Sequence, residues 1–237
     1  MTQHAPLPKR FERATPAPGL YARLHAQIEA TPASRMATSR RVAAALMVVP
    51  ALSAIAVAVA SQIVYGAQAV GLTYGIHSSS SILRALMGLV ALTVVATFVA
   101  TRSGHGFGAG VTQLVMTAAL ATPAYAALTF ADALHSTDIG GPSGVVLSGW
   151  AYRCLILAAL VGALALAAFT LASRRAVAAG AKVRGAALGA AAGLWSGLAV
   201  FVFCPSANGG HLMIGHVLPI LAFTVLGAVA IPRFLRP

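Results

Sequence analysis

The chain has 237 residues, of which 59% are hydrophobic and only 8% are charged, and its mean hydropathy is +0.85. Soluble globular domains carry roughly a quarter charged residues, so this composition excludes an ordinary soluble domain. The net charge of +12 comes from 16 basic and 4 acidic residues. Because no basic segment is interleaved with aromatic residues, direct nucleic-acid binding is not expected.

The N-terminal segment, residues 1–42, is polar, basic and rich in proline. It contains no short apolar core of a signal peptide, so we expect the first hydrophobic span to act as an uncleaved signal anchor. The stretch PGLYARLHAQIEATP predicts a short helix in which Leu20, Leu24 and Ile28 recur at every fourth position. This apolar stripe either lies on the lipid surface or docks into the groove of a partner protein, and the pattern leaves both open.

Six apolar runs follow, each near or above the roughly 18–20 residues that cross a bilayer. Their limits are 43–65, 83–101, 111–130, 151–172, 187–204 and 213–232. Their continuous apolar character predicts helices, since membrane strands alternate in polarity. We therefore predict an all-α polytopic membrane protein, with a six-helix transmembrane domain over residues 43–232 and a short C-terminal tail over residues 233–237.

The basic residues predict the orientation of these spans. If the N-terminus is cytoplasmic, 14 of the 16 Lys and Arg residues lie on the inner side of the membrane. The two exceptions, Arg84 and Arg153, stand at the start of a span, where their side chains can reach the interface. This asymmetry predicts that both termini are cytoplasmic.

Glycines recur at every fourth position from just before the fifth span into it, at Gly185, Gly189, Gly193 and Gly197. Such a row forms a smooth helix face that allows a second helix to approach closely. Packing within the chain is the favoured interpretation, because five other helices compete for this face. A dimer surface is the alternative, and the oligomeric state stays open.

Acid–base chemistry is poorly represented in this sequence. The four carboxylates are Glu12, Glu29, Asp132 and Asp138, and none lies in a span. This disfavours both an ion-coupled transporter and paired-carboxylate catalysis. Histidine pairs spaced as in helical zinc motifs, nucleophile elbows and phosphate-binding glycine loops are also missing from the sequence. We expect neither an enzyme nor a resident cofactor.

Two cysteines carry the remaining chemistry. Cys154 opens the fourth span shortly after Trp150 and Arg153, and Cys204 closes the fifth span directly before Pro205. The predicted topology places both thiols at the outer ends of their helices. They are either small apolar core residues, a pair able to form a disulfide in an oxidising compartment if their Cα atoms lie within about 7 Å, or soft ligands for transient binding of a thiophilic metal.

Histidines near the sixth span are the next candidates. His211 and His216 flank its start, and His135 lies in the preceding outer loop. The spacing Cys-x6-His-x4-His matches no standard zinc pattern. We therefore take His211 as the third potential metal ligand beside the two thiols, and rank His216 and His135 behind it.

The order of these features resembles the NrsF-type (negative regulator of sigma F) anti-sigma factors. The likeness rests on W-x-x-R-C-L at the start of span four and F-C-P at the end of span five, which are here Trp150, Arg153, Cys154, Leu155, Phe203, Cys204 and Pro205. The resemblance implies a bacterial inner-membrane protein that holds an extracytoplasmic-function sigma factor inactive. It further implies that the N-terminal tail is the main sigma contact, and that Cys154 and Cys204 sense metal or oxidative stress.

The chain departs from the family pattern beside the second cysteine. There the family commonly has a histidine before the cysteine and an acidic residue after the proline, whereas this chain has Phe203 and Ser206. The change removes two potential metal ligands. It favours thiol oxidation over direct metal chelation at the cysteine pair.

Two other classes of protein remain as alternatives. A small transporter or channel for a thiophilic metal predicts a polar pore-facing side on one helix, and these spans offer mainly Thr, Ser and Gly. A membrane thiol oxidoreductase usually has a Cys-x-x-Cys motif or an acid–base partner beside each thiol, and the sequence shows neither. Both alternatives therefore rank behind the regulatory interpretation.

Overall fold

The computed structural model describes most of the predicted transmembrane domain. The described residues are 47–56, 79–101, 110–133, 149–173, 180–204 and 209–234, together with Gly19 and Val59. All regular structure in these ranges is helical, and every described helix belongs to the unit Val42–Pro237. The tail residues Leu20, Leu24 and Ile28 lie outside the described residues.

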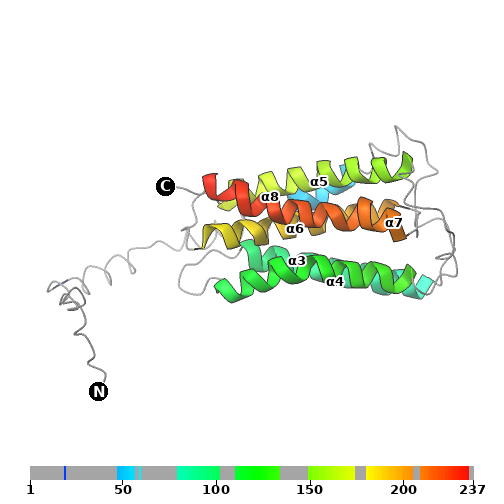
Figure 1. Ribbon diagram of the computed structural model, residues 1–237, viewed down its shortest axis with the longest axis horizontal. Helices are drawn as coiled ribbons and strands as arrows, with labels where there is room; N and C mark the ends of the chain where they lie inside the picture. Colours follow the sequence, from blue (N-terminus) through cyan, green and yellow to red (C-terminus); the bar gives the residue numbers. More distant parts are fainter. Residues whose placement is uncertain are drawn as a thin grey trace, which may run out of the picture. The chain divides into compact units, whose positions relative to one another are not determined.

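Five helical segments are long and apolar enough to cross a membrane. They are α3 (Ser79–Thr101), α4 (Val111–Ala133), α5 (Gly149–Ser173), α6 (Ala181–Phe203) and a last segment, Gly209–Phe234, made of α7 (Gly209–Leu212), the π-helical turn η5 (Met213–Val217) and α8 (Leu218–Phe234) (Figure 1). The all-helical prediction is thus confirmed for the described residues. Of the first predicted span, 43–65, the structure describes a short apolar helix, Met47–Ala56. This first span, and with it the total of six, stays a prediction.

The fifth predicted span begins earlier than the sequence suggested. Its helix starts at Ala181, directly after Gly180, whose φ of 70° lies in the left-handed region that favours glycine. The limit of 187 excluded Lys182 and Arg184 because they are charged. In the structure Lys182 is exposed, whereas Arg184 is buried at the start of the helix.

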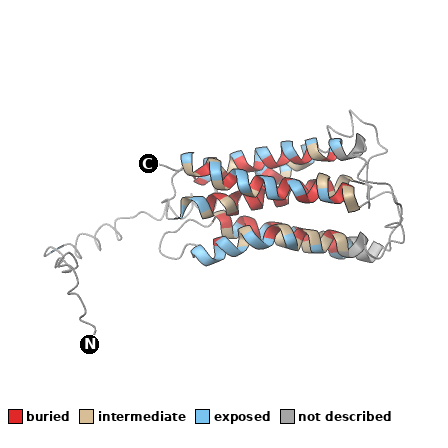
Figure 2. Ribbon diagram, in the orientation of Figure 1, coloured by how far each residue is buried: buried red, intermediate tan, exposed pale blue. Residues whose placement is uncertain are grey.

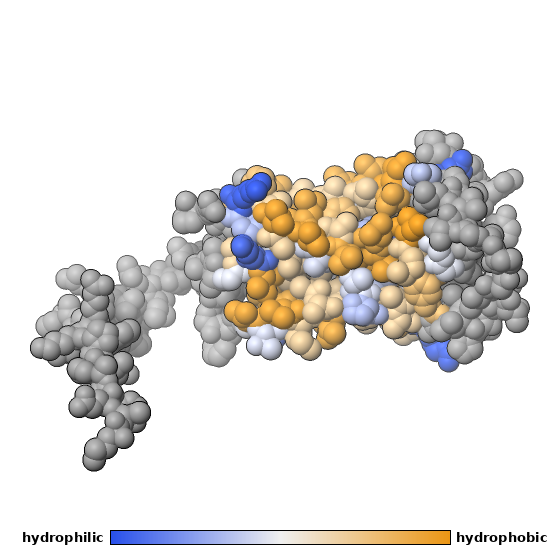
Figure 3. Space-filling model, in the orientation of Figure 1, coloured by the Kyte–Doolittle hydropathy of each residue, from blue (hydrophilic) through white to orange (hydrophobic). Residues whose placement is uncertain are grey.

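The distribution of burial among the described residues suits a lipid environment. Large apolar side chains such as Val95, Phe98 and Val225 are exposed on the outer faces of the helices, while the polar Thr97 and Ser196 are buried between them (Figure 2). Hydrophobic residues cover most of the visible helical surface (Figure 3). Water would penalise so much exposed apolar surface, but a bilayer does not. The bundle is therefore consistent with a membrane protein.

Helix α6 is the centre of the bundle, since it contacts α3, α4, α5 and α8 (Figure 1). Three glycines of its predicted smooth face, Gly185, Gly189 and Gly193, lie against the backbone of α8, and Gly227 of α8 lies against the first two. A Cβ atom at Gly193 would come within 2.6 Å of the Ile220 Cα atom. The two helix backbones therefore approach as closely as they do because these side chains are missing.

Two side-chain hydrogen bonds tie other helices to α6. The Trp195 indole donates to Thr97 Oγ1 of α3 at 3.1 Å, and the Tyr125 hydroxyl of α4 donates to the Gly197 carbonyl at 2.8 Å. Thr97 in turn donates to the Thr93 carbonyl one helical turn earlier. Polar groups in a bilayer must be satisfied within the protein, and these pairs fix how α3 and α4 sit against the central helix.

We predict that Gly189→Ala destabilises the bundle because the new Cβ would meet the Phe223 carbonyl carbon at 2.8 Å and the Thr224 Cα atom at 3.0 Å. Backbone atoms of α8 cannot move aside as a side chain can. The expected loss in the free energy of unfolding is about 1–3 kcal/mol, measured by denaturant unfolding in detergent micelles.

The matched control is Gly88→Ala in α3. Its Cβ would meet the end of the flexible Leu128 side chain at 3.0 Å, which can rotate away. We expect a clearly smaller loss there. Equal losses for the two variants would contradict the assignment of the α6–α8 contact as the tight one.

Candidate functional site

The two cysteines meet at one end of the bundle. α5 and α6 are consecutive helices in contact, so the start of α5, with Cys154, lies beside the end of α6, where Cys204 follows the last helical residue. Cys204 is extended, with φ −85° and ψ 121°, as expected for a residue that precedes a proline. The thiol of Cys204 therefore stands just where the chain leaves the helix.

The two histidines come from the next segment. His211 lies in α7 and His216 in η5. In a regular α-helix, residues five apart point about 140° away from each other. Over Met213–Val217 the helix widens into a π-turn, closed by the Leu218 N–H, which donates to the Met213 carbonyl. The two rings lie in an edge-to-face arrangement with their centroids 5.5 Å apart.

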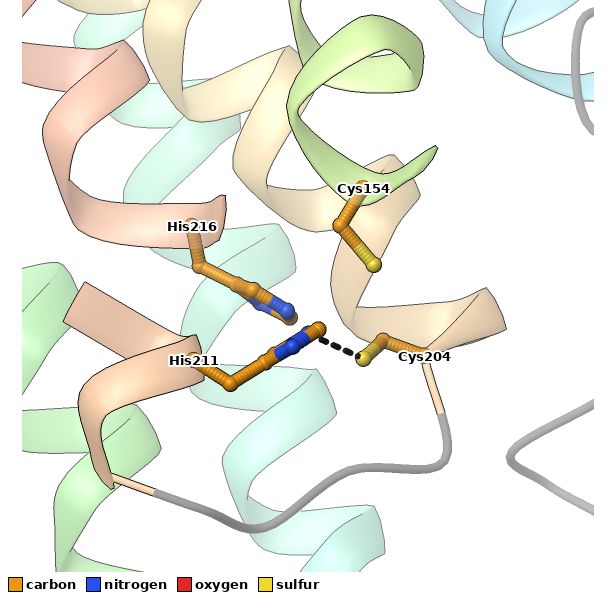
Figure 4. Close-up of side chains that lie close together, drawn as sticks. All are labelled: Cys154, Cys204, His211 and His216. Carbon is orange, nitrogen blue, oxygen red and sulfur yellow. Dashed lines mark hydrogen bonds between the residues drawn. The ribbon is translucent and has the colours of Figure 1, made fainter. Parts of the chain in front are cut away.

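These four side chains form one cluster, which we call the thiol–imidazole site: Cys154, Cys204, His211 and His216. One donor atom from each lies within 4.8 Å of the others, and all four side chains point toward a common centre (Figure 4). His211 Nε2 lies 3.0 Å from Cys204 Sγ. Cys154, His211 and His216 are buried, and Cys204 is half-buried. Both cysteines are free thiols.

Tyr125 indicates which ring nitrogen of His216 carries the proton. Its hydroxyl proton is used in the bond to the Gly197 carbonyl, so its oxygen accepts at the long 3.4 Å contact with His216 Nδ1. The network thereby assigns the proton to Nδ1 and leaves a lone pair on Nε2. Within the described ranges no hydrogen-bond partner reaches His216 Nε2, although the atom is buried. A buried polar atom without a partner costs about 1–3 kcal/mol.

The structure brings together three site residues taken from the sequence, Cys154, Cys204 and His211, and adds His216. Arg153 is exposed. The side chain of Trp150 falls outside the description, as do Pro205 and His135. Of the four glycines, Gly197 differs from the others, since it faces the ring of Tyr125, whose Cε2 atom would lie 2.7 Å from a Cβ placed there.

Two contributors were missed or ranked too low by sequence reasoning. His216 ranked low because Cys-x6-His-x4-His was compared with patterns built on α-helices and short loops, whereas η5 changes the angular spacing. Tyr125 was missed entirely, since it comes from α4 and lies 91 positions before His216. A tyrosine in the middle of an apolar span that also contains Pro123 was the only local signal.

The donor set defines which chemistry is open to the site. Two sulfur and two imidazole donors match the ligands of tetrahedral zinc-type sites, and two neighbouring thiols are also the substrate of oxidation to a disulfide. No carboxylate occurs among the described residues of the cluster. The imidazoles of His211 and His216 thus offer two nitrogen donors in place of the histidine and the acidic residue that the family pattern has at positions 203 and 206.

An apolar helical bundle with buried polar contacts and five helices long enough to cross a bilayer is consistent with a polytopic membrane protein. The chain belongs to the NrsF family, described as negative regulator of sigma F, whose model matches residues 28–236. The match confirms the resemblance inferred from the sequence, and the family name implies negative regulation of a sigma factor. Neither a curated protein nor a solved structure matches the chain.

We predict that a mild two-electron oxidant such as diamide joins Cys154 and Cys204 within one chain, because their sulfur atoms lie within 4.8 Å. The reaction removes one hydrogen from each thiol and reduces the diazene to a hydrazine. Intact mass after alkylation measures it. The single variants Cys154→Ser and Cys204→Ser are the controls, and exclusive formation of disulfide-linked dimers by the wild type would contradict the observed proximity.

Proposed function

We propose that this protein is an inner-membrane anti-sigma factor that holds an extracytoplasmic-function sigma factor inactive and releases it when the Cys154–Cys204 pair senses metal or oxidative stress. The observation that carries the proposal is the family match over residues 28–236. It is supported by the five apolar helices. The excess of basic residues at one side supports six spans with both termini in the cytoplasm.

The N-terminal tail is the proposed contact with the sigma factor. Residues 1–42 form the longest segment outside the predicted spans. The stripe of Leu20, Leu24 and Ile28 is suited to a groove on a partner protein. A cytoplasmic tail would also stand on the same side of the membrane as a sigma factor.

For sensing to cause release, a structural change at the thiols must alter helix contacts at the other end of the bundle. Ala54, on the helix that follows the tail, packs against the apolar cluster that contains Cys154 and Val200. Gly197 of α6 lies against Tyr125, which contacts His216. The other three glycines of α6 lie against the backbone of α8. A change in how α5 and α6 pack at the thiols would therefore alter the packing of the first helix and the α6–α8 contact.

Oxidation of the pair is one form of the signal. The two thiols lose two protons and two electrons to a peroxide and form a disulfide, while an organic hydroperoxide is reduced to an alcohol and one water, and hydrogen peroxide to two waters. Shifting a two-state equilibrium from 1:99 to 99:1 takes about 5.5 kcal/mol of differential stabilisation. A covalent bond or a metal bridge between α5 and α6 would contribute to this shift to the extent that it forms in only one of the two states.

Charge on the apolar stripe should abolish binding of the sigma factor. We predict that full-length Leu24→Glu no longer co-purifies with the cognate sigma factor in detergent, because a carboxylate cannot enter an apolar groove. The matched control is Ala26→Glu, which adds the same charge roughly on the opposite side of a helix. If neither variant changes retention, the tail is not the contact. If the wild type itself retains no sigma factor, the anti-sigma proposal fails.

Removing both thiols should leave repression of the sigma factor intact and abolish its release. We predict that the double variant Cys154→Ser, Cys204→Ser still represses a sigma-dependent reporter in cells but no longer responds to oxidant or thiophilic metal. Serine preserves size and polarity and lacks the redox chemistry and the soft ligand. A normal response in the double variant would overturn the role of the cysteines as sensors.

A further inference from the structure

We propose that Cys154, Cys204, His211 and His216 together bind one thiophilic divalent cation of the zinc and cadmium class, with His216 as a ligand through Nε2 and Tyr125 as its positioning residue. The inference rests on the proposed function only for its biological consequence. The ligand set itself follows from the structure.

His216 carries most of the argument. It is 1% exposed, and its Nε2 atom is buried without a hydrogen-bond partner in the described part of the chain. The Tyr125 contact holds the proton on Nδ1 and leaves the lone pair on Nε2, and the side chain of His216 points toward the two cysteines (Figure 4). A histidine that binds a metal through one ring nitrogen typically donates the other N–H to a fixed acceptor, and Tyr125 Oη is such an acceptor.

The π-turn explains how both imidazoles reach the same centre. Without η5, residues 211 and 216 would face different sides of a helix. With it, the two rings approach to 5.5 Å between centroids, and His211 Nε2 faces Cys204 Sγ. Single π-turns within α-helices are frequent at functional sites, and here the distortion has a defined geometric result.

The dimensions and the charge of the thiol–imidazole site both suit a tetrahedral divalent cation. Metal–sulfur and metal–nitrogen bonds of about 2.3 and 2.0–2.1 Å place tetrahedral donors roughly 3.3–3.8 Å apart, and the donor atoms here lie within 4.8 Å. A contraction of about 1 Å therefore completes the site. Two thiols release two protons on binding a divalent cation, and two thiolates with two neutral imidazoles leave no net charge at this half-buried location.

Contraction of the site would also couple cation binding to the packing of the helices. Cys154 and Cys204 come from α5 and α6, whereas the imidazoles come from α7 and η5. Binding would draw the start of α5 and the end of α6 toward the segment that continues into α8. The same residues that recognise the cation would thus alter the helix contacts on which the proposed release depends.

The test is Co²⁺ titration of the full-length protein in detergent with a non-thiol reductant, followed by displacement with Zn²⁺. We expect one equivalent of Co²⁺, with the sulfur-to-cobalt charge-transfer band and the strong d–d bands of a tetrahedral thiolate site.

His216→Gln, His211→Gln and either cysteine-to-serine variant should weaken Zn²⁺ binding at least tenfold. Tyr125→Phe should weaken it about 10- to 100-fold, as outer-shell partners of ligating histidines do. The control His105→Gln, in the connection between α3 and α4, should bind as the wild type.

X-ray absorption of the Zn²⁺-loaded wild type keeps the inference falsifiable if a variant fails to fold. Two sulfur and two imidazole ligands are expected. A zinc shell without imidazole, no uptake of Co²⁺ or Zn²⁺, or unchanged affinity in both histidine variants would overturn the inference. Because no sigma factor takes part, a protein that binds metal but retains no sigma factor refutes only the proposed function. One that retains sigma factor but binds no metal refutes only the metal site.

Discussion

The close approach of α6 and α8 is the constraint on which the rest of the structure depends. Gly185 and Gly189 of α6 face Gly227 of α8, so the two backbones are nearly in contact at the end of the bundle opposite the thiols. η5 continues directly into α8, and Cys204 caps α6. The contact between these two helices therefore sets the distance from the thiol of Cys204 to both imidazoles. A bulkier helix face would leave the four donors too far apart to act together.

A bilayer around the bundle would give its few buried polar contacts a large share in selecting which helices pack together. Outside the bundle, apolar side chains gain little by choosing one helix neighbour over another, because lipid is equally apolar. The Trp195–Thr97 and Tyr125–Gly197 hydrogen bonds supply the choice of partner that hydrophobic burial cannot. Tyr125 has both tasks, since it joins α4 to α6 and also orients His216. Packing and site geometry are in this way fixed by one side chain.

Much of the helical framework was predictable from the sequence because bilayer thickness imposes a length on every span. The limits 83–101 and 111–130 fall within α3 and α4, and the expectation that Cys154 and Cys204 lie at one end of the bundle follows from connecting helices in antiparallel order. Hydropathy was less informative at charged ends. Lys182 and Arg184 moved the expected start of α6 by several residues, although a helix continues through basic residues near an interface.

The composition of the site was harder to predict than its location. A cluster of residues from three separate helical segments has no characteristic spacing. The contribution of His216 also depends on a π-turn that the residues MIGHV do not predict. Tyr125 comes from a helix distant in the sequence, and its role depends on where the Gly197 carbonyl points. Such contacts follow from tertiary packing, which local patterns do not encode.

The π-turn also bears on how this segment tolerates a change in length. A π-turn holds one residue more than the same turn of α-helix, whereas one residue removed from a regular helix rotates everything after it by about 100°. Loss of one residue within Met213–Val217 would therefore leave an ordinary helical turn, with Gly227 still facing Gly185. Loss of one residue between Leu218 and Gly227 would instead turn Gly227 away from α6. The turn that contains His216 is thus a place in this helix where the chain can shorten by one residue without altering the packing of α6 against α8.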